Sequence, residues 1–81
     1  MKAFSNKLSL MQKYLQDLET AIFWHYSMMS WIRQANSQKK SANEYPQLIS
    51  HSLSMIKDRK DARDLHLSLA RKFRNELENL K

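Results

Sequence analysis

The sequence contains no cysteine and no glycine, and it has one proline among its 81 residues. Without cysteine the chain has no disulfide, no thiolate metal site and no cysteine nucleophile. Without glycine it lacks the loops in which the backbone cradles a phosphate, because those loops need positive φ angles or a close approach to the ligand. The composition therefore gives no support to a thiol-dependent enzyme or to a phosphate-cradling loop.

Long apolar runs are also missing. The most apolar window covers residues 21–32 and still includes His25, Tyr26 and two serines. A membrane-spanning helix needs about 20 predominantly apolar residues, so this window is too short to be one. The beginning of the chain mixes polar and apolar side chains and has no apolar stretch typical of a leader peptide. We expect a soluble, cytoplasmic protein without a membrane span.

Signals for a turn are confined to residues 37–46, a polar stretch that ends in the single proline. A proline is tolerated in the first turn of a helix, where its missing N–H has no intrahelical partner. The rest of the sequence predicts two long helices, at about residues 4–36 and 46–80, in one domain that spans residues 1–81. The predicted fold is all-α, an antiparallel two-helix hairpin. A break near residues 58–60, which gives three helices, is the alternative.

The first predicted helix carries a sustained heptad pattern, in which successive members are alternately four and three residues apart. The members are Phe4, Leu8, Met11, Leu15, Leu18, Ile22, His25, Met29 and Ile32. Such spacing keeps one side of a helix against a partner, so we expect this side to pack on the second helix. The second helix has a continuous polar line, which predicts its solvent-exposed face. That line consists of Ser54, Asp61, Ser68 and Asn75.

An aromatic line lies outside this predicted contact. Trp24 and Trp31 are seven residues apart, on a side of the helix that points away from the second helix if Ile22 and Met29 face it. Because Trp and Met are favoured at protein interfaces, we expect this side to bind a partner. The predicted interface residues are Tyr14, Phe23, Trp24, Met28 and Trp31. Truncating the two tryptophans is then expected to weaken association while the hairpin stays folded.

Three arrangements account for such a line. A chain this short buries little surface alone, so a second copy that completes a four-helix bundle is the expected arrangement. A groove for a different protein and packing within a three-helix monomer are the alternatives. The proposed partners are therefore the chain itself, another protein, or both.

A polar layer is predicted near the middle of the hairpin. Antiparallel pairing of the two helices sets His25 opposite Arg59 and brings Arg63 near Glu19. The simpler interpretation is that the arginine stems pass along the contact and that the glutamate pairs with one of them. The functional interpretation is that the layer fixes the register and the choice of partner.

The formal net charge of +6 raises the question of nucleic-acid binding. Five acidic residues are spaced four residues after a basic one, so they can neutralise part of the charge on solvated helix faces. The remaining bases cluster only at Arg33, Lys39 and Lys40, near the predicted loop. With Arg71, these residues are the candidates for contact with an RNA or DNA backbone, which would be sensitive to salt. No helix-turn-helix, zinc-finger or basic-zipper spacing is present.

Catalytic and metal-binding patterns are absent from the sequence. His25, His51 and His66 stand apart, at spacings that do not form a zinc motif. We therefore expect no enzyme activity, no metal and no cofactor. The predicted function is that of a non-enzymatic protein–protein interaction module, such as an adaptor, small chaperone or inhibitor. The alternative is a basic helical bundle that binds RNA or DNA as a small regulator.

Overall fold

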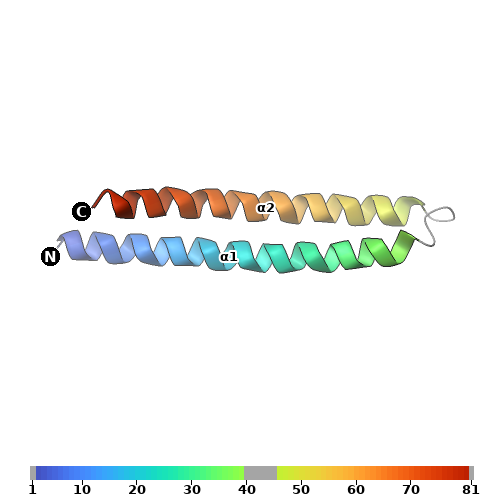
Figure 1. Cartoon of the computed structure of the whole chain (residues 1–81), viewed down its shortest axis with the longest axis horizontal. Coiled ribbons are helices and arrows are strands. Elements are labelled where there is room, and N and C mark those ends of the chain that lie inside the picture. The colour runs from blue at the N-terminus through green and yellow to red at the C-terminus, as the bar shows by residue number, and fades with distance from the viewer. Residues whose placement is uncertain (1, 40–45, 81) are drawn as a thin grey trace.

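The computed structural model describes residues 2–39 and 46–80, and it consists of two long α-helices. Helix α1 spans Lys2–Gln38, and helix α2 spans Pro46–Glu78. The helices run antiparallel and side by side, as Figure 1 shows. The predicted all-α hairpin is confirmed, and so is a second helix that continues through residues 58–60. Much of the predicted turn, at residues 40–45, lies outside the described residues.

The lengths of the helices follow from the absence of breakers. Neither glycine nor proline interrupts the 37 residues of α1. Helix α2 begins at the single proline, where the missing N–H costs no intrahelical hydrogen bond. It ends in a tightened turn, in which Leu80 N donates to Leu77 O at 3.2 Å. No residue of the described segments has a positive φ angle.

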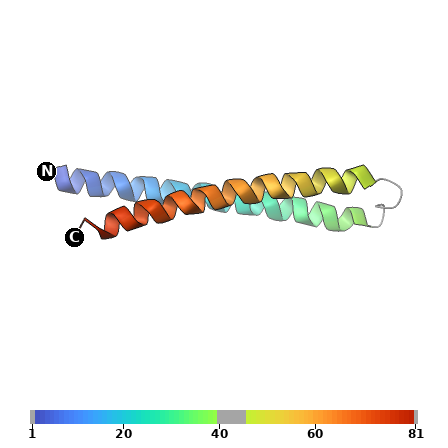
Figure 2. The same ribbon diagram turned by 90° about the horizontal axis from the view of Figure 1, so that it is seen from above.

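The hairpin is a thin rod with extents of 64 × 13 × 13 Å. Figure 2 shows the two helices crossing near the middle of the rod. The accessible surface is 6450 Å², whereas a compact monomer of this size is expected to expose roughly 5,100 Å². Much apolar surface therefore stays in contact with water.

The contact between the helices is made by a different heptad from the predicted one. Ala21 and Met28 of α1 are buried, together with Ser52 and Ala70 of α2. From Leu10 onward, all the α1 residues in the same heptad are at least partly buried, whereas Lys7 is exposed. This heptad, here called the inner stripe, consists of Leu10, Tyr14, Asp17, Ala21, Trp24, Met28, Trp31, Ala35 and Gln38.

The prediction that the heptad from Phe4 to Ile32 packs on α2 is therefore wrong for most of its members, since five of them are exposed and three are only partly buried; the side chain of Phe4 lies outside the described residues. Leu15 and Ile22 of that heptad have 57% and 56% of their surface exposed. Seven of its eight members from Leu8 onward lie one residue after a member of the inner stripe, and one residue corresponds to a rotation of about 100° about the helix axis. We call this exposed heptad the outer stripe; it consists of Leu8, Met11, Leu15, Leu18, Ile22, His25, Met29 and Ile32.

The polar composition of α2 explains why the inner stripe is the one that packs. The residues of α2 that face α1 form a heptad with four polar members. This heptad is Ile49, Ser52, Ile56, Arg59, Arg63, His66, Ala70, Phe73 and Leu77. Buried polar groups need partners, and the inner stripe supplies an indole ring, a thioether, a carboxylate and an amide. Apart from His25 and the thioethers of Met11 and Met29, the outer stripe is aliphatic.

The exposed face of α2 agrees with the prediction. All four members of its polar line, Ser54, Asp61, Ser68 and Asn75, are exposed. Neither helix of the described segments is apolar over a long enough stretch to cross a membrane.

Candidate protein-interaction face

Arg59 lies in the contact between the helices without an acidic partner from α1. Its guanidinium carbon is 5.7 Å from the centre of the Trp24 ring. Its Nη1 is 4.0 Å from the sulfur of Met55, and its Nε is buried with no hydrogen-bond partner among the described residues. The cation is therefore held mainly by a cation–π contact and by packing, which compensate only part of the cost of burial.

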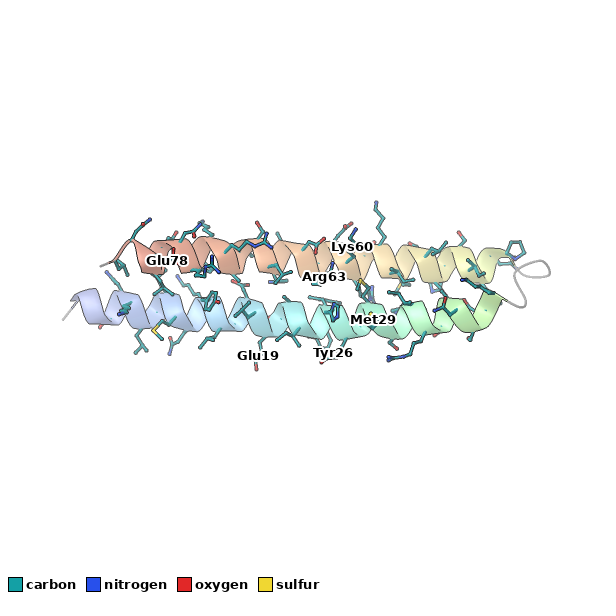
Figure 3. All side chains as sticks on the ribbon, in the orientation of Figure 1. Glu19, Tyr26, Met29, Lys60, Arg63 and Glu78 are labelled. Carbon is teal, nitrogen blue, oxygen red and sulfur yellow. The ribbon has the colours of Figure 1, made fainter. Side chains whose placement is uncertain are left out.

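Arg63 reaches from α2 towards α1, as Figure 3 shows. Its Nε donates a hydrogen bond to Asp64 at 3.1 Å, and its Nη1 lies 3.2 Å from His25 Nδ1 and 3.9 Å from Met28 Sδ. The side chain keeps 22% of its surface exposed. Arg63 thus connects the buried contact with the surface beside it.

The predicted polar layer is only partly assembled. His25 lies beside Arg63, whereas the contact of Arg59 with α1 is to Trp24. Glu19 is exposed and points away from α2 (Figure 3). The cause is the rotation of α1: once the inner stripe faces α2, position 19 falls on the far side of the helix. The predicted proximity of Glu19 to Arg63 is therefore corrected.

Two polar contacts that were not predicted from the sequence also join the helices. Asp17 Oδ1 and His66 Nδ1 are 2.9 Å apart, and both side chains are largely buried. Ser52 Oγ donates a hydrogen bond to Gln38 Oε1 at 2.7 Å, and Ser52 has no exposed surface. The signal was present in the spacing, because Asp17, Trp24 and Trp31 are seven residues apart and occupy one heptad position.

Most of the predicted interface residues pack on α2. Tyr14, Trp24, Met28 and Trp31 belong to the inner stripe, and the Trp31 ring meets the His51 ring edge to face at 5.6 Å. Phe23 is the exception: it is 62% exposed and contacts the edge of its neighbour Trp24. The apolar surface of α1 that α2 leaves exposed is therefore formed by the outer stripe together with Phe23 and Tyr26.

A groove opens beside the contact, between the outer stripe and α2. Its volume is about 370 Å³, and most of its lining is apolar. The lining residues are Leu18, Ala21, Ile22, His25, Tyr26, Arg63 and Leu67. The groove combines aliphatic side chains from α1 with one cation from α2, so it presents both an apolar surface and a positive charge.

Basic side chains extend along the α2 edge of this groove. Lys60 and Arg74 are seven residues before and after Leu67, so they share its line along the helix. Arg71 is one turn beyond Leu67. Lys60, Arg63, Arg71 and Arg74 together are called the basic rim.

Acidic residues neutralise only part of the basic rim. Arg63 contacts Asp64, and Arg74 Nε lies 3.6 Å from Glu78 in an exposed pair. Within residues 2–39 and 46–80, no carboxylate lies within ion-pair distance of Lys60 or Arg71. Both side chains are exposed.

The candidate nucleic-acid residues do not form one patch. Arg33 and Lys39 are exposed near the loop end of α1, and Lys40 lies outside the described residues. Arg71 lies 25 residues after Pro46, which places it about 37 Å along α2 from the loop end. A single nucleic-acid contact at the loop end would not include it.

The described segments contain no group of three or more residues that could hold a metal ion. No protein-family model, no curated protein and no solved structure matches this chain.

Proposed function

We propose that this chain is a non-enzymatic protein–protein interaction module that binds a partner helix along the outer stripe of α1. Adaptor, small chaperone and inhibitor are the roles that fit such a module. The observation that carries the proposal is the largely apolar outer stripe, in which Leu8, Met11, Leu15 and Ile22 are exposed while Leu18, Met29 and Ile32 are only partly buried.

An apolar heptad that stays exposed to water contributes little hydrophobic stabilisation to the fold. Leu8, Leu15 and Ile22 keep about half of their surface exposed in the hairpin alone. Contiguous apolar surface on a soluble chain marks an interaction site more often than not. A helix with two apolar sides is typical of bundles in which it has two neighbours.

Two kinds of partner suit the outer stripe. Its alternating steps of four and three read the same in reverse, so two copies can pair their stripes antiparallel and form the four-helix bundle expected from the sequence. A helix from a different protein can occupy the same stripe and give a three-helix bundle. In both cases the partner covers Leu15 and Ile22.

The test replaces Leu15 and Ile22 together with glutamine. Because both side chains are more than half exposed, we expect the helical circular dichroism and the midpoint of urea unfolding to change little. Association is expected to be lost, measured by sedimentation velocity of the purified chain and by affinity capture from cell lysate.

The matched control is Leu65→Gln, since Leu65 is 58% exposed on α2 and does not line the groove. It is expected to keep every association that the unmodified chain has. If Leu15→Gln with Ile22→Gln keeps all of them too, the outer stripe is not the binding face and the proposed function is wrong.

A further inference from the structure

We propose that the partner is a single amphipathic α-helix with acidic side chains along one edge, which lies in the groove and completes a three-helix bundle. This inference rests on the proposed function, because it names the partner for the same face. It is carried by the combination of an apolar floor and a basic rim on one side of the hairpin.

The outer stripe, which extends beyond the groove at both ends, selects for a helix with a regular apolar stripe. The outer stripe runs from Leu8 to Ile32 at heptad spacing, a length of about 36 Å. An apolar helix face with side chains at the same spacing fits such a surface along its whole length, which is how helices bind in grooves. A partner segment of about 24 residues covers the stripe.

The rim selects for negative charge next to that apolar face. Lys60 and Arg71 are exposed and have no carboxylate within ion-pair distance in the described segments, and Arg63 lines the groove beside His25. Carboxylates on the partner can pair with these cations, and charge-assisted hydrogen bonds are stronger than neutral ones. The acidic edge also fixes the direction in which the partner can lie.

The same charges disfavour a second copy as the partner. A four-helix bundle formed through two outer stripes places the α2 helices beside each other on their groove sides. On that side the line through Leu67 carries Lys60 and Arg74, and the next line carries Arg71 between Asp64 and Glu78, so that the cations, with Arg63, outnumber the carboxylates. Two such edges repel each other, and each chain has a net charge of +6.

The experiment uses two fluorescent peptide probes with leucine at the heptad positions. The flanking positions carry glutamate in one peptide and lysine in the other. Binding to the full chain is measured by fluorescence anisotropy at low and at high salt. We expect the glutamate peptide to bind at least about tenfold more tightly at low salt, with a smaller ratio at high salt because exposed charges are screened.

Charge reversal in the rim gives the sharper test. Lys60→Glu together with Arg71→Glu changes two exposed residues, so folding is expected to be unaffected. The variant should bind the lysine peptide more tightly than the glutamate peptide. Such a reversal cannot result from a loss of folding. Lys72→Glu, an exposed change on α2 outside the basic rim, is the control and should keep the original preference.

Three results would overturn the inference of an acidic partner helix without deciding whether the outer stripe is a binding face. Equal binding of the two peptides rules out an acidic partner. A dimer of the chain that the glutamate peptide does not dissociate assigns the face to a second copy, which leaves the proposed function intact. Binding of a duplex RNA by the rim, unchanged by Leu15→Gln with Ile22→Gln, assigns the rim to phosphate. If neither peptide binds and the chain neither self-associates nor captures a partner, the proposed function fails as well.

Discussion

The polar side chains of α2 decide which side of α1 is buried. Arg59 lies over an indole ring, and Ser52 and His66 each make a hydrogen bond to a polar group of α1. A buried donor or acceptor without a partner costs about 1–3 kcal/mol, which is comparable to the gain from burying one aliphatic side chain. These residues therefore outweigh the larger aliphatic content of the outer stripe.

Arg59 is the residue whose replacement should stabilise the hairpin. Its Nε is buried without a hydrogen-bond partner in the described part of the chain, so Arg59→Leu removes an unsatisfied donor and a buried charge. We expect the free energy of unfolding to rise by about 1 kcal/mol, measured from urea denaturation. Lys57→Ala, an exposed change on the same helix, should stay within about 0.5 kcal/mol. A loss of stability in Arg59→Leu would show that the contact with Trp24 is worth more than the burial costs.

Asp17 and His66 should be energetically coupled across the two helices. Their atoms are 2.9 Å apart and both side chains are largely buried. Single alanine substitutions at these positions should each destabilise the hairpin, and the double-mutant cycle should give a coupling free energy of about 1 kcal/mol. The same cycle between Asp17 and Arg74 is the control. Additive effects of Asp17→Ala and His66→Ala would contradict the contact.

At the scale of the elements, α1 differs from α2 in having two heptads. The inner stripe packs on α2, and the outer stripe lies one residue further along the sequence and remains mostly exposed. A helix that carries two such stripes is built for two neighbours. Helix α2 has one heptad against α1 and a polar line on its exposed face. The exposed apolar heptad of the hairpin is therefore on α1.

The two stripes of α1 should respond differently to truncation. Trp24 and Trp31 pack on α2, so replacing both with alanine should lower the stability by about 3 kcal/mol or more and reduce the helical circular dichroism. The expectation from the sequence was the opposite, namely that the hairpin stays folded when the two tryptophans are truncated. The comparison is Leu15→Ala with Ile22→Ala, which removes exposed side chains and should leave the fold unchanged. Equal losses in the two variants would contradict the assignment of the stripes.

The whole molecule is a rod with little interior. Among the residues that the structure describes, the buried apolar ones are Ala21, Met28 and Ala70, and two of these are alanines. Hydrophobic stabilisation grows with the apolar area removed from water. A hairpin this thin is therefore expected to be only marginally stable by itself. A third helix in the groove would bury the outer stripe and part of the basic rim.

Partner binding should therefore appear as thermal stabilisation. Addition of the glutamate peptide at about one hundred times its dissociation constant should raise the free energy of unfolding by about 2.7 kcal/mol. Melting curves followed by circular dichroism, with and without the peptide, measure the shift. The chain alone should melt at a temperature that does not depend on its own concentration. A melting temperature that rises with the concentration of the chain would show that a second copy stabilises it instead.

The sequence by itself determined the two helices, their antiparallel arrangement and the exposed face of α2. Breakers are absent over long segments, and local propensity is sufficient to place helix ends near Pro46 and near residue 36. The polar line through Ser54 and Asp61 marked the solvent side, because no other element competes for it.

The tertiary structure alone decided which heptad of α1 is inside. The sequence of α1 offers two stripes one residue apart, and the more aliphatic one, with Leu15 and Ile22, is the more obvious core. The choice depends on α2, whose Arg59 and His66 need an aromatic face and a carboxylate that only the inner stripe provides. The sequence pattern of one helix shows which of its sides are apolar. Which of those sides is buried depends on the polar groups of the other helix and on the hydrogen-bond and aromatic partners that they need.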